Sequence, residues 1–313
     1  MIALAQTTLQ RIGLIATLVL ASAGANCAQA AEPTATTANL AAEIRELGDI
    51  ELLVFDGRED FLRQIDNALG LGNIKNPDET FAKLPRSPFT VTGRKGDEAL
   101  AICRIFIPAK ITPESHTEIF AELMRNWFGT KLSYASNSDL TFRWLIFHEM
   151  RHCQPDHFGG DELKDHQDEL EADLSAFEYL ANAQNRNALA TDIAAFRVIT
   201  SALFAEHSHM IGLSLRHTLE TPDQMVPFSA EQEMAAFQTV RQQIGKRAQL
   251  IATAVTPTNR ELIRAITELR QAVDQGTETK SNSLAGEILI ALDDAIAHFA
   301  PELHQSVANI RAN

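Results

Sequence analysis

The sequence of 313 residues predicts an α+β fold that is predominantly helical. We expect a small N-terminal β-sheet, then a helix that carries a His-Glu-x-x-His motif, then a C-terminal helical bundle. Two observations predict this class. Strand-like runs occur only before residue 110, whereas apolar residues recur at helical spacing from residue 112 onward. The chain also has only 15 Gly and 11 Pro, which argues against a turn-rich all-β sandwich.

Charge and composition narrow the class of partner. The chain has 27 Lys and Arg against 41 Asp and Glu, a formal net charge of −14. Nucleic-acid binding depends on cationic side chains that neutralise phosphates, so we expect no nucleic-acid partner. Hydrophobic residues make up 45% and charged residues 22%, which is typical of a globular protein.

Residues 1–30 have the pattern of a secretory signal peptide. Arg11 is their only charged residue, Ile12–Ala25 is apolar, and Ala28–Ala30 supplies a small-x-small cleavage site. Cleavage after Ala30 removes Arg11, so 26 basic and 41 acidic residues remain and the net charge is −15. A lipid anchor at Cys27 is the alternative. No later stretch is long enough to span a bilayer, so we expect a periplasmic or secreted protein.

The mature chain keeps two cysteines, Cys103 and Cys153. An even number of cysteines in an oxidising compartment suggests a disulfide between them. The alternative is a pair of buried thiols.

The N-terminal part contains the predicted sheet. Residues 31–39 are polar and rich in Thr, and we expect them to be disordered. The strands are predicted at Glu51–Phe55, Phe89–Thr92 and Ala101–Ile107, with a helix at Asp60–Leu71 and a hairpin loop at Gly93–Asp97. The last run alternates with a period of two residues, as a strand does.

The remainder is predicted to be helical. Thr112 is a good N-cap, and Pro113 suits the first helical position. The apolar face of this helix comprises Ile119, Phe120, Leu123, Met124 and Trp127. Further helices are predicted from Ser138 to about residue 150 and at 163–184, 188–207, 229–254, 258–275 and 283–299. Apolar stripes such as Ile263, Ile266 and Leu269 are predicted to pack in the core, with a partner surface as the alternative.

The strongest functional signal is the motif His148-Glu149-Met150-Arg151-His152. Residues four apart share one face of a helix, so both imidazoles can bind one metal ion. Glu149 would then lie where a carboxylate can take a proton from water. The preceding residues, 142–147, are apolar enough for a buried helix. The alternative is two hydrogen-bonded core histidines with an unrelated glutamate.

A catalytic Zn²⁺ needs a third protein ligand and an open coordination position. Helical phase selects among the acids of residues 165–177. The predicted core stripe is Leu170, Leu174, Phe177 and Ala181, and the predicted solvated face carries Glu171, Ser175 and Glu178. Glu169 and Asp173 lie at the edge of the stripe, beside Ala172, Ala176 and Leu180.

Glu169 is therefore the predicted third ligand, and Asp173 is predicted to accept the second N–H of a ligating histidine. The alternative is that both acids lie on a solvated helix edge. His166 falls on the same face and is an alternative ligand, because imidazole also suits zinc.

The motif followed by Glu-x-x-Ala-Asp on a second helix resembles the gluzincin metallopeptidases, of the thermolysin-like and CaaX-prenyl-protease-like kinds. It is also similar to small secreted bacterial metallopeptidases of unknown substrate. The resemblance covers about Leu145 to Phe177. It implies that His148, His152 and Glu169 bind zinc, that Asp173 supports a zinc histidine, and that Glu149 is the base. The third histidine of metzincins is absent, because Phe158 stands at its place.

The same resemblance implies a later His or Arg near the developing oxyanion. His209 and Arg216 are the candidates, because His-x6-Arg is similar to a His-Pro-x4-Arg element of the family. The Pro is missing and the spacing differs by one residue. The alternative is a group of histidines at a helix end.

A competing hypothesis uses Glu149-x-x-His152 and Glu206-x-x-His209 as the two pairs of a ferritin-like di-iron centre. It leaves His148 without a role. A third hypothesis is a non-catalytic periplasmic binding protein with a structural zinc. The sequence has no P-loop, dinucleotide fingerprint or nucleophile elbow.

The sequence thus predicts a zinc metallopeptidase that hydrolyses peptide or protein substrates. Its predicted organisation is a signal peptide at 1–30, a disordered segment at 31–39, a metallopeptidase-like core at 40–185 and a helical region at 186–313. The strand at Ala101–Ile107, if it is a sheet edge near the motif, could pair with an extended substrate.

Overall fold

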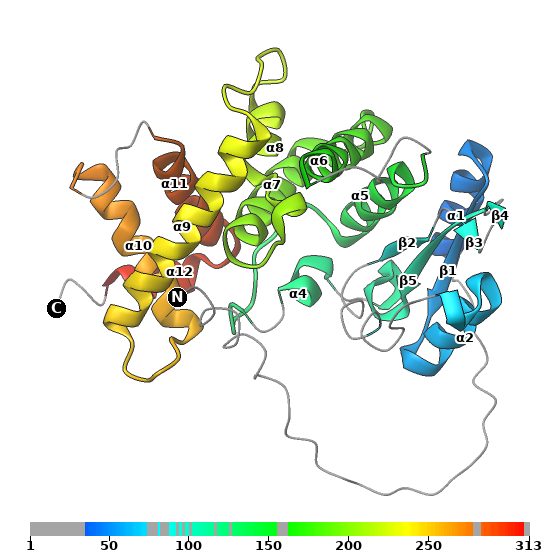
Figure 1. The fold of residues 1–313 in the computed structure, drawn as a ribbon, viewed down its shortest axis with the longest axis horizontal. Helices are drawn as coiled ribbons and strands as arrows, with labels where there is room; N and C mark the ends of the chain where they lie inside the picture. Colours follow the sequence, from blue (N-terminus) through cyan, green and yellow to red (C-terminus); the bar gives the residue numbers. More distant parts are fainter. Residues whose placement is uncertain are drawn as a thin grey trace, which may run out of the picture.

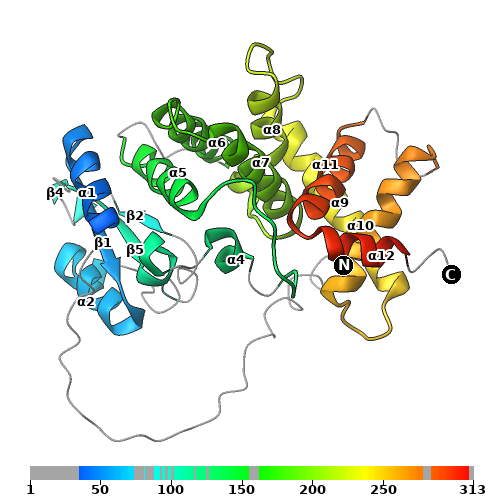
Figure 2. The same ribbon diagram turned by 180° about the vertical axis from the view of Figure 1, so that it is seen from behind.

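A computed structural model describes residues 35–73, 81, 88–91, 94–95, 98–99, 102–115, 118–124, 127–154, 162–277 and 283–309. The predicted signal peptide lies outside these residues. The sheet lies at one end of the long axis and the C-terminal helices at the other, with α5 (Ser138–Arg151), α6 (Glu162–Tyr179) and α7 (Arg186–Leu203) between them (Figures 1 and 2). The predicted class, mostly helical with a small N-terminal sheet, is confirmed.

The main sheet has the strand order β1 (Ile50–Phe55), β5 (Cys103–Pro108), β2 (Phe89–Val91). β1 and β5 are parallel, with Ile50 opposite Cys103, and β2 is antiparallel to β5, with Phe89 opposite Phe106. Parallel strands need a crossover connection, and α2 (Gly57–Leu69) lies in it. The predicted hairpin region forms a second small sheet from β3 (Arg94–Lys95) and β4 (Glu98–Ala99).

The alternation of β5 gives the sheet two buried faces. Ile105 and Ile107 pack into the main core with α1 (Ala35–Leu47) and α5, whereas Phe106 packs with Phe61 of α2 on the opposite face. One predicted placement is wrong. β5 is the central strand and presents no free edge; among the described strands of this sheet, β1 and β2 are the outer ones.

α1 corrects the predicted disorder of residues 31–39, because Ala35–Asn39 are helical. Leu40 and Ile44, one turn apart, are buried in the core that contains the sheet. Burial of this face stabilises the helix, whose N-terminal end contains Thr36, Thr37 and Asn39, residues of low helix propensity.

The helix predicted from Thr112 is also shorter than expected. Residues Pro113–Ser115 form a 3-10 turn, and α4 (Ile119–Leu123) starts only after Glu118, whose backbone is extended. Of the predicted apolar face, Ile119, Phe120, Met124 and Trp127 are buried and Leu123 is partly buried, but Met124 and Trp127 lie beyond the end of α4.

The remaining helices, apart from α8 and α12, follow the prediction closely. The full set is α5 (Ser138–Arg151), α6 (Glu162–Tyr179), α7 (Arg186–Leu203), α8 (Gly212–Glu220), α9 (Ala230–Ile251), α10 (Asn259–Asp274), α11 (Leu284–Phe299) and α12 (Pro301–Asn309). α9 and α10 each begin with a capping box, at Ser229 and Thr258. In each box the N-cap side chain accepts the backbone N–H of the third helical residue, whose own side chain accepts the N-cap backbone N–H. No helix in the described part of the chain is long and apolar enough to cross a bilayer.

α8 and α12 were not predicted. The N-cap position of α8 is Ile211, which offers no capping side chain. Glu233 of α9 instead accepts the backbone N–H groups of Leu213 and Ser214, at 2.8 and 2.9 Å. A cap supplied by another helix leaves no local signal in the sequence.

Candidate metal centre

α5 carries the His-Glu-x-x-His motif into the interior. Asn137 caps the helix, since its Oδ1 accepts the N–H of Leu140 at 2.8 Å. Every residue from Trp144 to Met150 is buried, which confirms the predicted buried helix. His148 and His152 lie one turn apart, and each is 4% exposed.

The two histidines meet Glu169 of α6, as predicted. Their Nε2 atoms lie 3.2 Å apart. His148 Nε2 is 3.5 Å from Oε2 of Glu169, and His152 Nε2 is 3.6 Å from Oε1. A tetrahedral zinc ion with bonds of about 2.0–2.1 Å separates neighbouring ligand atoms by about 3.3–3.4 Å. The spacing of this group therefore suits one metal ion.

The chemistry of the group also fits a cation. Oε2 of Glu169 is buried and has no hydrogen-bond donor among the described residues. A buried carboxylate oxygen without a donor is unfavourable, and a cation would satisfy it. These three residues form the one convergent group of potential ligands in the described part of the chain. They could hold a metal ion.

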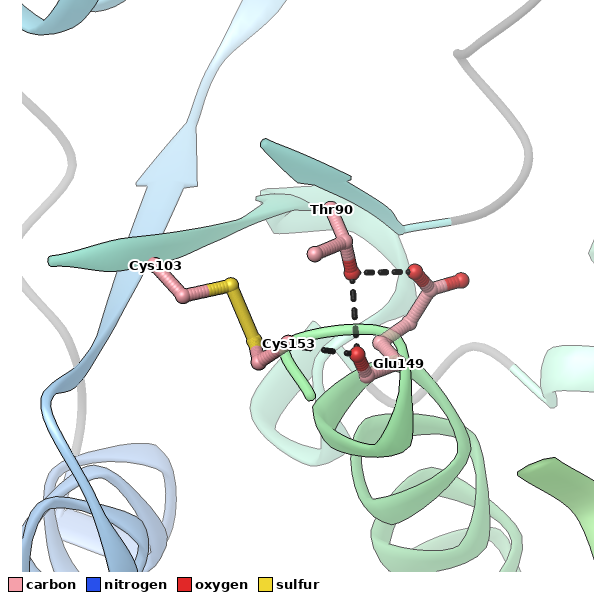
Figure 3. The surroundings of a disulfide bond; sticks show 4 residues. All are labelled: Thr90, Cys103, Glu149 and Cys153. Atoms are coloured by element: carbon pink, nitrogen blue, oxygen red, sulfur yellow. Dashed lines mark hydrogen bonds between the residues drawn. A yellow bond between two sulfur atoms is a disulfide. The ribbon is translucent and has the colours of Figure 1, made fainter. Parts of the chain in front are cut away.

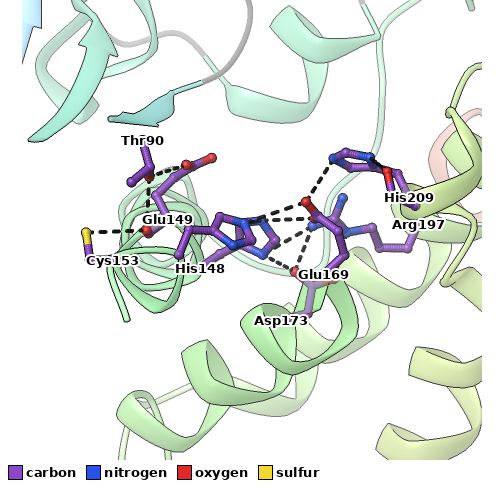
Figure 4. A network of polar contacts seen from close by, with 10 residues as sticks. Thr90, His148, Glu149, Cys153, Glu169, Asp173, Arg197 and His209 are labelled. Atoms are coloured by element: carbon purple, nitrogen blue, oxygen red, sulfur yellow. Dashed lines mark hydrogen bonds and ion pairs between the residues drawn. The ribbon is translucent and has the colours of Figure 1, made fainter. Parts of the chain in front are cut away.

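Asp173 supports this group from behind, as predicted (Figure 4). Its Oδ1 lies 2.8 Å from Nδ1 of His148, which leaves Nε2 free to face the ligand site. Arg197 of α7 binds the same carboxylate with both Nε and Nη2, at 2.7 and 2.8 Å. Sequence reasoning missed Arg197. The one sign of Arg197 in the sequence is that a charged residue stands within the apolar stretch of α7.

The contacts among these buried side chains shift the pKa values of His148, Asp173 and Glu169. Burial acts to lower the pKa of His148, but the Asp173 carboxylate outweighs burial and raises that pKa to about 9. Burial acts to raise the pKa of Asp173, but Arg197 and His148 hold it below its usual value. Burial opposes ionisation of Glu169 as well, yet His148 and His209 hold its pKa well below the usual range. Both acids are therefore carboxylates, the form that binds a cation.

Glu149 lies beside the ligand group and contacts the sheet. The hydroxyl of Thr90 on β2 lies 2.7 Å from Oε2 of Glu149 and 3.0 Å from its backbone oxygen. Burial raises the pKa of Glu149 to about 7, against the lowering effects of His148 and Thr90. A carboxyl group with a pKa near neutrality can both accept and donate a proton. No sequence signal pointed to Thr90.

The structure brings His209 to the same place. It belongs to the 3-10 turn His207–His209, and its Nε2 lies 3.1 Å from Oε1 of Glu169. Its side chain is 47% exposed, so it stands between the buried ligands and solvent.

Two predicted site residues lie elsewhere. His166 lies outside the convergent ligand group, because its Nε2 lies 3.2 Å from both the Met210 carbonyl and Oε2 of Glu233. It precedes Glu169 by three residues and is turned from it by about 60° around α6, which is enough to direct its ring to these other partners. Arg216 is also outside the site. It pairs with Glu220 on α8 and lines a separate pocket between α7, α8 and α11.

The pairs proposed for a di-iron centre do not meet either. Glu206 is exposed at the N-cap of a 3-10 turn, not on an α-helix with His209. It lies outside the one convergent ligand group of the described residues.

The buried face of α6 differs from the predicted stripe. Glu171 is exposed as expected and pairs with Arg151 at 3.0 Å, and Glu178 is exposed. However, Leu170 and Leu174 are only partly buried, and Ala181 is exposed. The buried residues of α6 instead include His166, Asp168, Ala172, Ala176 and Phe177, together with the pair Glu169 and Asp173. The polar pair turns inward because its partners on α5 and α7 are there.

Cys103 and Cys153 form a disulfide, which confirms the predicted pair (Figure 3). Their Cα atoms are 5.7 Å apart. The bond joins the central strand β5 to the residue directly after His152. It is consistent with an extracytoplasmic protein, as the signal-like N-terminus predicts.

A cleft of about 670 Å³ opens onto this site. His148, Glu149, Arg197 and His209 line it together with large apolar side chains. The volume lies in the usual range for ligand pockets, about 300–1,000 Å³.

No protein-family model matches the chain, and comparisons with curated proteins and with solved structures find no match. The residues and geometry of the site therefore carry the functional argument.

Proposed function

We propose that the protein is a secreted or periplasmic zinc-dependent metallopeptidase. One observation carries the proposal: two helical histidines and a glutamate converge in a buried group, beside a second glutamate, at the base of an open cleft. Two nitrogens and one carboxylate are the protein ligands of many catalytic zinc sites, which keep one position open.

His148, His152 and Glu169 would hold the ion. When bound, Zn²⁺ supplies Lewis acidity, which makes water more acidic and polarises a carbonyl group. Glu149 would accept the proton of the attacking water and deliver it to the leaving amine. His209, half-exposed at the mouth of the site, would donate a hydrogen bond to the developing oxyanion. Asp173 and Arg197 would keep His148 in the correct orientation and tautomer.

The position of β2 supports an extended peptide as substrate. β2 is an outer strand of the described sheet, and its Thr90 contacts Glu149. An outer strand has unpaired backbone groups that can bind a peptide by strand addition. β2, and not the central strand β5, is therefore the strand we propose to pair with the substrate.

Metal analysis and a Glu149→Gln variant of the mature chain test the proposal. We expect one zinc ion per chain in both proteins, and cleavage of a peptide library by the wild type only. Loss of the base should lower kcat by about 10²–10⁴-fold. Glu171→Gln, the same change on the exposed face of α6, is the control and should retain both zinc and activity.

A chain that binds no metal and cleaves nothing would overturn the proposal. Tight zinc binding without turnover of any peptide would favour a non-catalytic zinc protein. Iron that is lost on Glu206→Ala would favour the di-iron hypothesis.

A further inference from the structure

We infer that the apolar end of the cleft binds a large apolar side chain of the substrate, next to the bond that is cleaved. The inference rests on the proposed function and specifies its substrate class: peptides with Leu, Phe or a similar residue at that position.

The walls of this end are aromatic and aliphatic. Trp144 and Phe196 are 0% and 7% exposed, and their rings pack edge to face at 6.5 Å. Trp127 is 7% exposed and packs against Phe204 at 5.7 Å. Phe204 is 52% exposed and forms the rim. Such a pocket gains free energy only from an apolar occupant.

The pocket and the metal ligands belong to one cleft. Trp144 precedes His148 by one turn on the same face of α5, and their ring centroids are 6.0 Å apart. The same cleft is lined by Glu149 and His209. A residue whose backbone lies at Glu149 would therefore place its side chain in the same cleft, where Phe204 is the exposed apolar residue and Trp144 lies behind the wall.

Charge argues against an acidic occupant. Among the described residues that line the cleft, Arg197 is the one permanent cation, and its guanidinium is bound by Asp173. Glu206 lines the same cleft and would repel an acidic side chain in the wild type and in a Glu149→Gln variant alike. A small residue would leave the apolar walls unfilled.

Intrinsic fluorescence provides a direct test, because the chain has two tryptophans and both line this cleft. The zinc-loaded Glu149→Gln variant is titrated with blocked peptides that differ at one position: Gly, Asp, Leu or Phe. We expect the Leu and Phe peptides to change the tryptophan fluorescence and to bind about tenfold or more tightly than the Gly and Asp peptides.

Phe204→Ala in the same background should reduce this preference severalfold. Tyr179→Ala is the matched control, because Tyr179 is a similarly exposed aromatic residue, 48%, outside the lining of the cleft. It should leave the preference unchanged.

Equal affinity for all four peptides would overturn the inference, and so would tighter binding of a free fatty acid than of any peptide. Wild-type cleavage without an apolar preference would overturn it while leaving the peptidase proposal intact. Apolar preference in binding without cleavage by the wild type would support the pocket and overturn the peptidase proposal.

Discussion

α6 and α10 have similar lengths, 18 and 16 residues, but they bury opposite kinds of surface. The buried face of α10 is mainly apolar and includes Ile263, Ile266 and Leu269, with Glu268 at its edge, 7% exposed. The buried face of α6 instead carries Glu169 and Asp173 among alanines. Burial of the first face stabilises the fold directly. Burial of the second desolvates charges, which is unfavourable unless partners offset it.

This difference in buried surface distinguishes α6, which carries the candidate site, from α10, which packs in the core. Ala172 and Ala176 are fully buried on α6, and their small side chains allow a close approach to α5. Arg197 and His148 supply the opposite charges that Asp173 needs. A helix that buries acids next to alanines is specialised to hold a site. A helix that buries isoleucines is specialised to hold the fold.

The largest effect is expected from Asp173→Ala on α6. The change leaves the guanidinium of Arg197 buried without its acceptor, so the free energy of unfolding should fall by about 3–5 kcal/mol. Zinc affinity should fall by about 10–100-fold, because His148 loses its orienting partner. Urea unfolding and competition with a chelator measure the two quantities. Asp173→Asn, which keeps one acceptor, should fall between this variant and the wild type; an unchanged zinc affinity in both variants would contradict the role of Asp173.

The counterpart on α10 is Ile266→Ala. Ile266 is 0% exposed, and removal of its side chain should lower the free energy of unfolding by about 2–4 kcal/mol. Zinc affinity should stay the same, because α10 supplies no ligand. A loss of zinc affinity in the folded variant would show that the two helices are coupled.

Asp192 on α7 is a buried carboxylate outside the candidate metal-ligand group. A substitution there tests whether burial of an acid by itself implies a role in metal binding. Asp192 is fully buried and accepts hydrogen bonds from Ser136, from the backbone of Ala135 and from His298. Asp192→Asn should lower the free energy of unfolding by about 2 kcal/mol at neutral pH, with zinc affinity unchanged.

Asp192 also predicts a dependence on pH. Burial acts to raise its pKa, but the hydrogen bonds from His298 and Ser136 outweigh burial and lower it below the usual 3.8. The unfolded chain therefore takes up this proton first, and the stabilisation is lost as the pH falls through the pKa of the folded state. Unfolding curves at pH 7 and pH 3 should show a larger loss in the wild type than in Asp192→Asn. Equal losses would be inconsistent with the lowered pKa.

The smallest effect is expected from Glu171→Ala on the exposed face of α6. Its ion pair with Arg151 is exposed on the Glu171 side, and such pairs contribute about 0–1 kcal/mol. Stability and zinc affinity should both remain close to the wild type. A loss comparable with that of Asp173→Ala would remove the distinction between the two faces of α6.

The sequence predicted what local spacing determines. The four-residue interval of His148 and His152 fixes their common face, and helical phase separated Glu169 from Glu171 correctly. Three predicted helix starts, at residues 229, 258 and 283, lie within one residue of the observed starts, where Ser229, Thr258 and Ser283 are the N-caps.

The failures have a common cause in tertiary structure. Strand order is not encoded in alternation, so the pattern of Ala101–Ile107 does not show that β5 is the central strand of the sheet. Arg216 was assigned from its spacing to His209, but the turn between them directs it to another pocket. Arg197 and Thr90 reach the site from a distant helix and strand, and neither belongs to a motif. The stripe of α6 was misplaced because the partners of its acids lie on other helices.

The disulfide anchors only part of the candidate metal-binding group to the sheet. The Cys103–Cys153 bond closes a covalent loop of the chain with a sequence separation of 50, and this loop includes all of α5. His148, Glu149 and His152 thus lie within a loop anchored to β5, whereas Glu169 and Asp173 lie outside it on α6. Any opening of the site is consequently expected to separate α6 from α5, so that the base and the two imidazoles stay on the sheet while the carboxylate ligand moves.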